Sequence, residues 1–331
     1  MGNNYMKPLD GFENKSNEQP VVQTNENNNN PPPQSDFTAT GRIYMKPIIP
    51  LQSSSDVNQI QPSASNESDE IRYAFEINHL THTFDEGTEH EFKIFDNFTL
   101  KVEDKPNISE VVSIMGGSGC GKSCLLKMAA GLMTPQSGEI KIHGEHIDEY
   151  KSVPMVFQSY SSFKWMTVID NVTLPMVLKG IDKKYARELA MEALKLVGLE
   201  EHATKYAKSS VLAGGQLQRV SIARCLTSGS EVFFLDEATG ALDIKMKREI
   251  QDLIIKIASE TEHTIINVTH SLEEALYISN KIFILQPNPC SIYKEMDINY
   301  GNYPRGRWIF ETEEYRNYNR ELGIILDNVC K

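Results

Sequence analysis

A glycine-rich octapeptide carries the strongest chemical signal in the sequence. Residues 116–123 read Gly-Gly-Ser-Gly-Cys-Gly-Lys-Ser, which satisfies the spacing G-x-x-x-x-G-K-[ST]. Glycines let successive backbone N–H groups turn inward around phosphate oxygens, and a following helix N-terminus adds positive partial charge. We therefore expect Lys122 to reach the β and γ phosphates of a nucleotide and Ser123 Oγ to ligate Mg²⁺. The predicted nucleotide-binding residues are Gly116, Gly117, Ser118, Gly119, Cys120, Gly121, Lys122, Ser123 and Cys124.

An acidic pair follows an uninterrupted apolar run further along the chain. Residues 232–235 read Val-Phe-Phe-Leu, which predicts a buried strand, and Asp236 and Glu237 come directly after it. A carboxylate at the carboxyl end of a strand lies on the ligand side of an open α/β sheet, where Asp236 can hold the water shell of magnesium. Glu237 could polarise a water for in-line attack on the γ phosphate. Alone the pair is an ordinary acidic strand end, but beside the glycine-rich loop it indicates nucleotide hydrolysis.

The elements that must position these residues alternate between strands and helices. Short β-branched or apolar runs predict strands, and apolar residues at helical spacing predict helices, so the pattern indicates an α/β domain. We expect strands at 111–115, 153–157, 232–235, 263–269 and 281–285, the last being the final core strand. We expect helices at 122–132, 166–178, 184–196, 246–257 and near 311–326, and Ser271 as the N-cap of another helix.

Further motifs resemble one family, the ABC-type ATPases, over about residues 75–285. The family's signature is similar to Leu212-Ala213-Gly214-Gly215-Gln216, and its glutamine loop is similar to Val156-Phe157-Gln158. Its D-loop resembles Gly240-Ala241-Leu242-Asp243, and His270 resembles its switch histidine. These motifs occur in the family's order, together with the glycine-rich loop and the acidic pair.

The resemblance implies a fold and a set of roles. The fold is that of a P-loop NTPase of the α/β class, with a RecA-like core, an antiparallel β-subdomain and an α-helical signature subdomain at about 159–228. ATP and Mg²⁺ are the implied ligands, with Glu237, His270 and Gln158 as catalytic residues and Ser123, Gln158 and Asp236 at the metal. Phe84 would stack on adenine, although its ring could equally belong to the core.

The resemblance also implies that the site is shared between two chains. Gly214 and Gly215 would offer N–H groups to the γ phosphate of ATP bound by a second copy, so a homodimer is implied. Between Gln158 and Leu212 there is room for a small helical subdomain but not for a long coiled coil, which favours a transporter subunit over chromosome-maintenance and DNA-repair relatives.

Two segments resemble one group of transporter ATPases, the nitrate, sulfonate and taurine importers. They are residues 163–172 and residues 289–292. This implies a peripheral protein on the cytoplasmic face of the cell membrane, with a membrane permease and a solute-binding protein as partners. An exporter, a lipid-extraction ATPase and a soluble ABC protein with a regulatory or assembly role remain alternatives.

Four positions depart from the family pattern. Ala213 stands where the signature usually has Ser, which predicts weakened but not abolished turnover. Ala238 replaces a proline and loosens the turn after Glu237, and Lys164 replaces a proline before Trp165. Cys290 replaces a turn glycine, so either the turn differs or a left-handed residue is strained.

Composition narrows the function classes. The chain has 331 residues, 33 Lys+Arg and 45 Asp+Glu, for a net charge of −12. No stretch approaches the ~20 apolar residues of a spanning helix, and the acidic balance argues against nucleic-acid binding. Five cysteines without a CxxC pair fit a reducing compartment.

The first 70 residues have a different composition. They contain 11 Asn and 8 of the 15 Pro, which predicts a disordered tail. Residues 286–331 are expected to form a C-terminal extension of the ATPase domain at 71–285. Within the tail, the string Tyr-Met-Lys-Pro occurs at 5–8 and again at 44–47, either as a duplicated docking motif or by chance.

Overall fold

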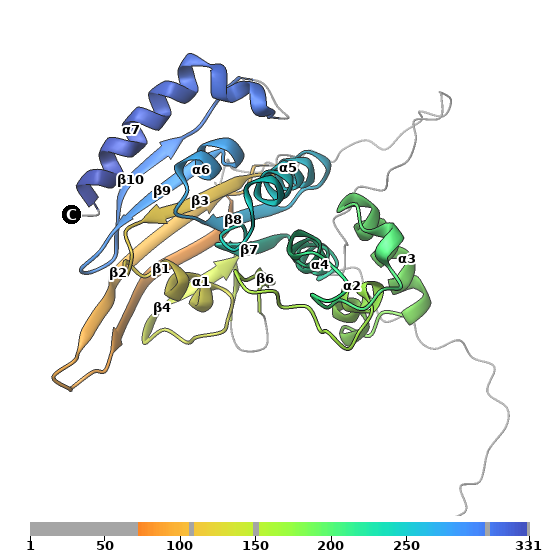
Figure 1. The fold of residues 1–331 in the computed structure, drawn as a ribbon. Coiled ribbons are helices and arrows are strands. Elements are labelled where there is room, and N and C mark those ends of the chain that lie inside the picture. Colours follow the sequence, from red (N-terminus) through yellow and green to blue (C-terminus); the bar gives the residue numbers. More distant parts are fainter. Residues whose placement is uncertain (1–71, 106–108, 148–151, 302–304, 330–331) are drawn as a thin grey trace, which may run out of the picture. The chain divides into compact units, whose positions relative to one another are not determined.

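The computed structural model describes residues 72–105, 109–147, 152–301 and 305–329. The tail at 1–70, with its predicted disorder and its repeated string, lies outside the described residues. The described part of the chain contains two β-sheets, a group of helices beyond one sheet edge and a C-terminal helix (Figure 1).

A six-stranded sheet positions most of the predicted site residues. Its strand order is β10-β9-β3-β8-β7-β6, and every neighbouring pair is parallel except β10 with β9. The strands are β3 (Val111–Gly116), β6 (Met155–Val156), β7 (Val232–Asp236), β8 (Thr264–Val268), β9 (Lys281–Gln286) and β10 (Ser291–Asp297). The carboxyl ends of β3, β8, β7 and β6 meet at one edge, so the residues that follow these strands are brought together there.

Burial explains why these sequences form the centre of the sheet. Strands β3 and β8 are buried at every position, and β7 is buried at all but Asp236. Strands of a parallel sheet are covered on both faces, so they read as continuous apolar runs. The helices of this part are α1 (Lys122–Ala129), α5 (Ile244–Glu260), α6 (Leu272–Ile278) and α7 (Glu313–Val329), the last of which packs against α6 and β9 and is preceded by the 3₁₀ helix η2 (Arg307–Glu311).

A four-stranded antiparallel sheet lies beside the first sheet in the packed core. Its order is β2-β1-β4-β5, and the strands are β1 (Tyr73–Phe84), β2 (Phe92–Glu103), β4 (Ser137–Ile142) and β5 (Glu145–His146). The two sheets are joined where the N–H of Cys290 donates to the carbonyl of Ile94, at 2.8 Å. Phe75 and Phe95 belong to the same buried cluster as Leu125 of α1, so this sheet packs against the helix that follows the glycine-rich loop.

A helical region carries the signature motif. It consists of α2 (Val168–Leu178), α3 (Lys183–Leu196), the 3₁₀ helix η1 (Glu200–His202) and α4 (Gly214–Leu226). Thr167 caps α2 and Asp182 caps α3 through their side-chain oxygens, as their residue types favour. Figure 1 shows α2, α3 and α4 grouped beyond the β6 edge of the larger sheet, and α4 packs against both β6 and α5.

The strands and helices expected from the sequence are present, and the last core strand expected at residues 281–285 is β9. Strand β10 was not expected: it follows β9 and pairs with it. Strand β10 lies at the sheet edge and exposes Tyr293, Lys294 and Glu295, so it lacks the apolar run that marks a central strand. In the turn before it, Asn288 takes the left-handed conformation with a φ of 64°, and Cys290 does not, so the turn differs from the expected one.

Candidate active site

The glycine-rich loop connects β3 to α1, as its motif requires. Gly116 cannot be replaced without movement, because a Cβ there would lie 2.5 Å from the carbonyl oxygen of Leu285. Gly119 and Gly121 have φ values of 77° and 98°, in the region that favours glycine. These three glycines give the loop a backbone path close to the sheet edge, which is the geometry that presents N–H groups to phosphate oxygens.

Lys122 is folded across the loop that precedes it. Its Nζ donates to the carbonyl oxygens of Gly116 at 3.0 Å and Gly117 at 2.8 Å, and the side chain is only 5% exposed. These two hydrogen bonds hold the Lys122 ammonium group in place at the glycine-rich loop. It can exchange these neutral acceptors for phosphate oxygens, which make stronger, charge-assisted hydrogen bonds.

The hydroxyl and the carboxylate predicted at the metal lie side by side. Ser123 Oγ donates to Asp236 Oδ1 at 3.3 Å, although 113 residues separate them in sequence. Burial raises the pKa of Asp236, and the hydrogen bond from Ser123 opposes that rise. Hydroxyl and carboxylate oxygens are the donors that Mg²⁺ prefers, so this pair fits the expected ion.

The predicted base and the predicted switch histidine are in direct contact. His270 Nε2 lies 2.6 Å from Glu237 Oε1, with the histidine half exposed and the glutamate 26% exposed. Glu237 has a φ of 47°, a conformation that non-glycine residues seldom adopt. The backbone at this position is therefore strained and must be held by its surroundings, which is common for residues at functional sites.

Gln158 is brought to the same turn from the neighbouring strand. It follows β6, its side chain is exposed, and its Nε2 lies 3.1 Å from the point where a Cβ on Gly240 would sit. Glycine at 240 therefore leaves space for the Gln158 amide beside the turn that begins at Glu237. The predicted catalytic residues Glu237, His270 and Gln158 all lie at the carboxyl edge of the parallel strands.

The signature residues form the start of α4. Ala213 is the N-cap residue and has no side-chain oxygen, but its own N–H donates to Gln216 Oε1 at 2.9 Å. Gln216 Nε2 in turn lies 2.7 Å from His202 Nε2 of η1. Leu212 is buried, whereas Ala213 is exposed, so the residue at which the signature departs from the family pattern lies at the surface.

The signature also contacts the D-loop within the chain. A Cβ on Gly214 would lie 3.5 Å from Leu242 Cδ2, and one on Gly215 would lie 3.3 Å from Met246 Cγ. Ala241 and Asp243 flank Leu242 and are exposed, and Asp243 caps α5 by accepting from the N–H of Met246 at 2.9 Å. The signature and the D-loop therefore form one continuous packed surface.

Phe84 lies at the end of β1, with its ring edge-on to His82 at 4.8 Å between centroids. It is partly buried against the cluster that contains Cys120 and Leu125. Both readings of Phe84, as core residue and as adenine-stacking residue, are compatible with this place.

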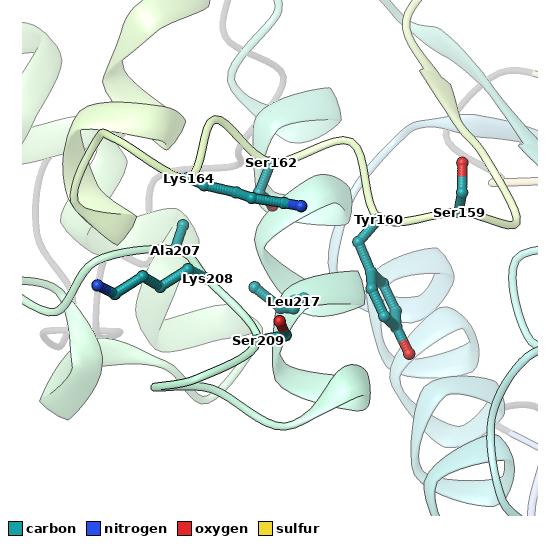
Figure 2. Close-up of a pocket in the computed structure, with 8 residues that line it drawn as sticks. All are labelled: Ser159, Tyr160, Ser162, Lys164, Ala207, Lys208, Ser209 and Leu217. Carbon is teal, nitrogen blue, oxygen red and sulfur yellow. The ribbon is translucent and has the colours of Figure 1, made fainter.

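A cavity of about 250 Å³ opens beside the glutamine loop (Figure 2). Its described lining residues are Ser159, Tyr160, Ser162, Lys164, Ala207, Lys208, Ser209 and Leu217, none of which is acidic. Figure 2 shows Tyr160 and Lys208 on opposite sides of Leu217, with the Lys164 side chain extending across above Leu217. The Tyr160 hydroxyl occupies the space over Gly214, since a Cβ there would lie 2.1 Å from it. Sequence reasoning missed Tyr160, whose only signal was its place two residues after Gln158.

The fold and these contacts define a nucleotide-binding P-loop protein of the α/β class. The sequence pattern of the ABC transporter family matches residues 96–240. An uncharacterised ABC transporter ATP-binding protein of Methanocaldococcus jannaschii is 35% identical over 264 residues, which are 80% of this chain and 95% of that protein. A taurine import ATP-binding protein of Pelagibacter ubique is 37% identical, covering 62% of this chain and 75% of its own.

Solved structures agree with these sequence relatives. A dimeric bacterial ABC transporter cassette, also solved in a post-hydrolysis state bound to ADP and Pi, matches with a TM-score of 0.57 and 30% identity over 68% of this chain and 99% of that chain. The protein cbiO1 of Clostridium perfringens, part of an ABC transporter complex, matches with a TM-score of 0.59 and 25% identity over 77% and 97% of the two chains.

The chain belongs to the ABC transporter ATP-binding proteins, a family of ATP hydrolases, and the resemblance found in the sequence is confirmed. Its P-loop NTPase fold is likewise confirmed by the solved cassettes. Among the described residues, none of the helices is both long and apolar enough to cross a membrane.

Proposed function

We propose that the chain is the ATP-hydrolysing subunit of a membrane importer for a small anionic solute such as nitrate, a sulfonate or taurine. The observation that carries the coupling is Tyr160, which lines the cavity beside Gln158 and also covers Gly214 of the signature. A partner segment bound in the cavity would therefore contact the chain next to the glutamine loop, and through Tyr160 it could shift the signature residues that bind the ATP of a second copy.

Hydrolysis would proceed at a site shared by two copies arranged head to tail. Lys122 would release the carbonyls of Gly116 and Gly117 and bind the β and γ phosphates. His270 would turn from Glu237 to the γ phosphate, which frees the Glu237 carboxylate to accept a proton from the attacking water. The signature glycines of the second copy would close the site, so closure precedes hydrolysis.

Ser123 and Asp236 would hold the magnesium ion, because their oxygens already lie 3.3 Å apart at the loop. When bound, Mg²⁺ supplies charge neutralisation between the β and γ phosphates. Gln158 would contribute a third oxygen from the next strand end, which makes the metal site sensitive to movement of the glutamine loop.

The chemistry of the cavity indicates an acidic partner segment. Lys164 and Lys208 line it, and Lys208 Nζ lies 5.6 Å from the ring centroid of Tyr206. Trp165 and Tyr206 beside it are 74% and 52% exposed, so cations and aromatic rings share one surface. A short amphipathic segment of the permease with carboxylates on one face would complement this surface.

Several relatives are named for import of nitrate, sulfonates or taurine, which supports the proposed class of solute. Besides the taurine protein, an aliphatic sulfonates import protein of Bacillus cereus is 36% identical over 68% of this chain, and a nitrate import protein of Synechocystis is 36% identical over 66%. A spermidine/putrescine import protein of Fusobacterium nucleatum is 42% identical over 58%, so identity alone does not select the solute. We place the chain on the cytoplasmic face of the membrane, with a permease and a solute-binding protein as partners.

Affinity purification from detergent-solubilised membranes tests this proposal. The wild-type chain is expected to retain a polytopic membrane protein, and a Lys164→Glu/Lys208→Glu variant is expected to lose it while keeping its ATPase rate in isolation. Purification of a soluble partner alone, with no polytopic protein, would favour the soluble ABC protein instead. Solute uptake by the co-purified complex in vesicles then separates an importer from an exporter.

A further inference from the structure

Glu274 is a buried carboxylate that no proposed step uses. It lies in α6, four residues after His270, and is 1% exposed. Its Oε2 accepts a hydrogen bond from Thr239 Oγ1 at 2.5 Å and lies 3.5 Å from Lys247 Nζ, while its Oε1 has no hydrogen-bond partner among the described residues. Burying a charge with one oxygen unsatisfied is unfavourable, so its place needs an explanation beyond packing.

The contact joins two segments that carry the chemistry. Thr239 lies two residues after Glu237 and is 2% exposed, and α6 starts immediately after His270 and its N-cap Ser271. The same two segments are joined a second time by the pair His270 Nε2 and Glu237 Oε1. In the proposed mechanism, only the second link breaks when ATP is bound, because His270 turns from Glu237 to the γ phosphate.

The turn that starts at Glu237 needs an anchor. Glu237 has a φ of 47°, and two backbone hydrogen bonds hold it. Its N–H donates to the carbonyl of Val268 at 3.0 Å, and its carbonyl accepts from the N–H of Gly240 at 2.8 Å. Ala238 lacks the ring by which a proline at this position would restrict the backbone of the turn. A strained backbone persists only where the surrounding structure over-determines it.

We infer that Glu274 is a positioning residue that acts through Thr239 to keep Glu237 aimed at the attacking water once His270 has left it. This inference rests on the proposed role of Glu237 as general base. The Glu274 carboxylate holds the Thr239 side chain, and Thr239 in turn holds the turn that starts at Glu237. Lys247 lies beside the buried Glu274 carboxylate while its own side chain stays 30% exposed, so it can offset the carboxylate's charge and remain hydrated.

Steady-state kinetics of the full chain test the inference. Thr239→Val keeps the shape and removes the hydroxyl, and it is expected to lower kcat about tenfold with the KM for ATP unchanged, the size expected for losing a hydrogen bond to a charged group. Thr239→Ser retains the hydroxyl and is expected to keep kcat near wild type. Glu274→Gln is expected to lower kcat by a smaller factor, and adding it to Thr239→Val is expected to lower kcat no further.

A matched control separates positioning from folding. Thr173 of α2 is 3% exposed, and its hydroxyl donates to the carbonyl of Ile169 at 2.7 Å. Thr173→Val also removes a buried threonine hydroxyl but is expected to leave kcat unchanged, so a lower kcat in Thr239→Val is not a general effect of losing such a hydroxyl. If Thr239→Val is poorly soluble, Glu274→Gln and Thr239→Ser carry the same comparison.

Two results would overturn the inference: wild-type kcat in Thr239→Val or Glu274→Gln, or losses in kcat that multiply in the double variant. Glu237→Gln, measured in the same assay, distinguishes a failure of the positioning role of Glu274 from a failure of the general-base role of Glu237. If Glu237→Gln is inactive while Thr239→Val is normal, only the positioning role fails. If Glu237→Gln retains the wild-type rate, the proposed role of Glu237 fails as well.

Discussion

The missing serine of the signature can be restored by one substitution, Ala213→Ser. Ala213 is the N-cap of α4, with extended φ and ψ of −67° and 160°, and its side chain makes no cap hydrogen bond. A serine there would accept from the N–H of Gln216 while the Gln216 side chain still accepts from the N–H of residue 213. Because a hydroxyl has one donor and two acceptor lone pairs, the same oxygen could also donate to a γ phosphate.

The two hydrogen bonds have separate magnitudes. The cap should add about 1 kcal/mol to the free energy of unfolding, which corresponds to a rise of about 2–4 °C in the melting temperature of a domain this size. The bond to phosphate is worth about 1.5–3 kcal/mol, so the ATP-bound dimer should form at least about tenfold more tightly. The first effect needs no nucleotide, and the second needs ATP and a second copy.

Three measurements on Ala213→Ser separate these effects. They are thermal unfolding without nucleotide, ATP-dependent dimerisation by sedimentation, and the steady-state ATPase rate, which should rise. Ala213→Cys is the matched control, because a thiol has similar size but is a weak hydrogen-bonding group. If Ala213→Ser has the dimerisation and ATPase rate of Ala213→Cys, a hydroxyl at residue 213 makes no hydrogen bond to the γ phosphate, even if the melting temperature rises.

Two further predictions concern stability and metal. Burial lowers the pKa of His263 to about 4 from its usual 6.5, so between these pH values the histidine is protonated in the unfolded chain but neutral in the folded one. The free energy of unfolding should therefore be unaffected by this histidine's titration above pH 6.5 and should fall by about 3 kcal/mol as the pH falls toward 4. In urea unfolding, His263→Gln should be less stable at pH 7 but lose less stability by pH 4.5, and equal losses in the two proteins would contradict this. Ser123→Ala should raise the Mg²⁺ concentration for half-maximal ATPase by about tenfold, as expected for losing one contact to a charged group, and an unchanged Mg²⁺ titration would remove Ser123 from the metal site.

Local patterns were enough to predict the parts of the site that follow a strand. The loop at 116–123 and the pair Asp236 and Glu237 adjoin continuous apolar runs, so their place at the carboxyl edge follows from parallel-sheet geometry. The resemblance to ABC-type ATPases added Gln158 and His270, whose types and spacing alone carry little information. The structure places Gln158 Nε2 3.1 Å from the point where a Cβ on Gly240 would sit, and the roles of Gln158 and His270 stay predictions.

The residues that sequence reasoning missed depend on contacts between distant segments. Thr239 and Glu274 are 35 residues apart, and neither has a pattern that marks it, because a glutamate in the first turn of a helix is ordinary. Tyr160 became visible only through the space it fills over Gly214. Strand β10 was missed because an edge strand exposes charged residues and loses the apolar signal of a central one.

The oligomeric state of Glu237→Gln with and without ATP tests whether two copies share the hydrolytic site. We expect this variant to bind Mg·ATP without hydrolysing it, and to change from a 37.4 kDa monomer to a dimer of twice that mass, as measured by size-exclusion chromatography with light scattering. ADP should leave it monomeric. If the variant stays monomeric with saturating ATP, the two copies do not share the site, and if it hydrolyses ATP at the wild-type rate, Glu237 is not the general base.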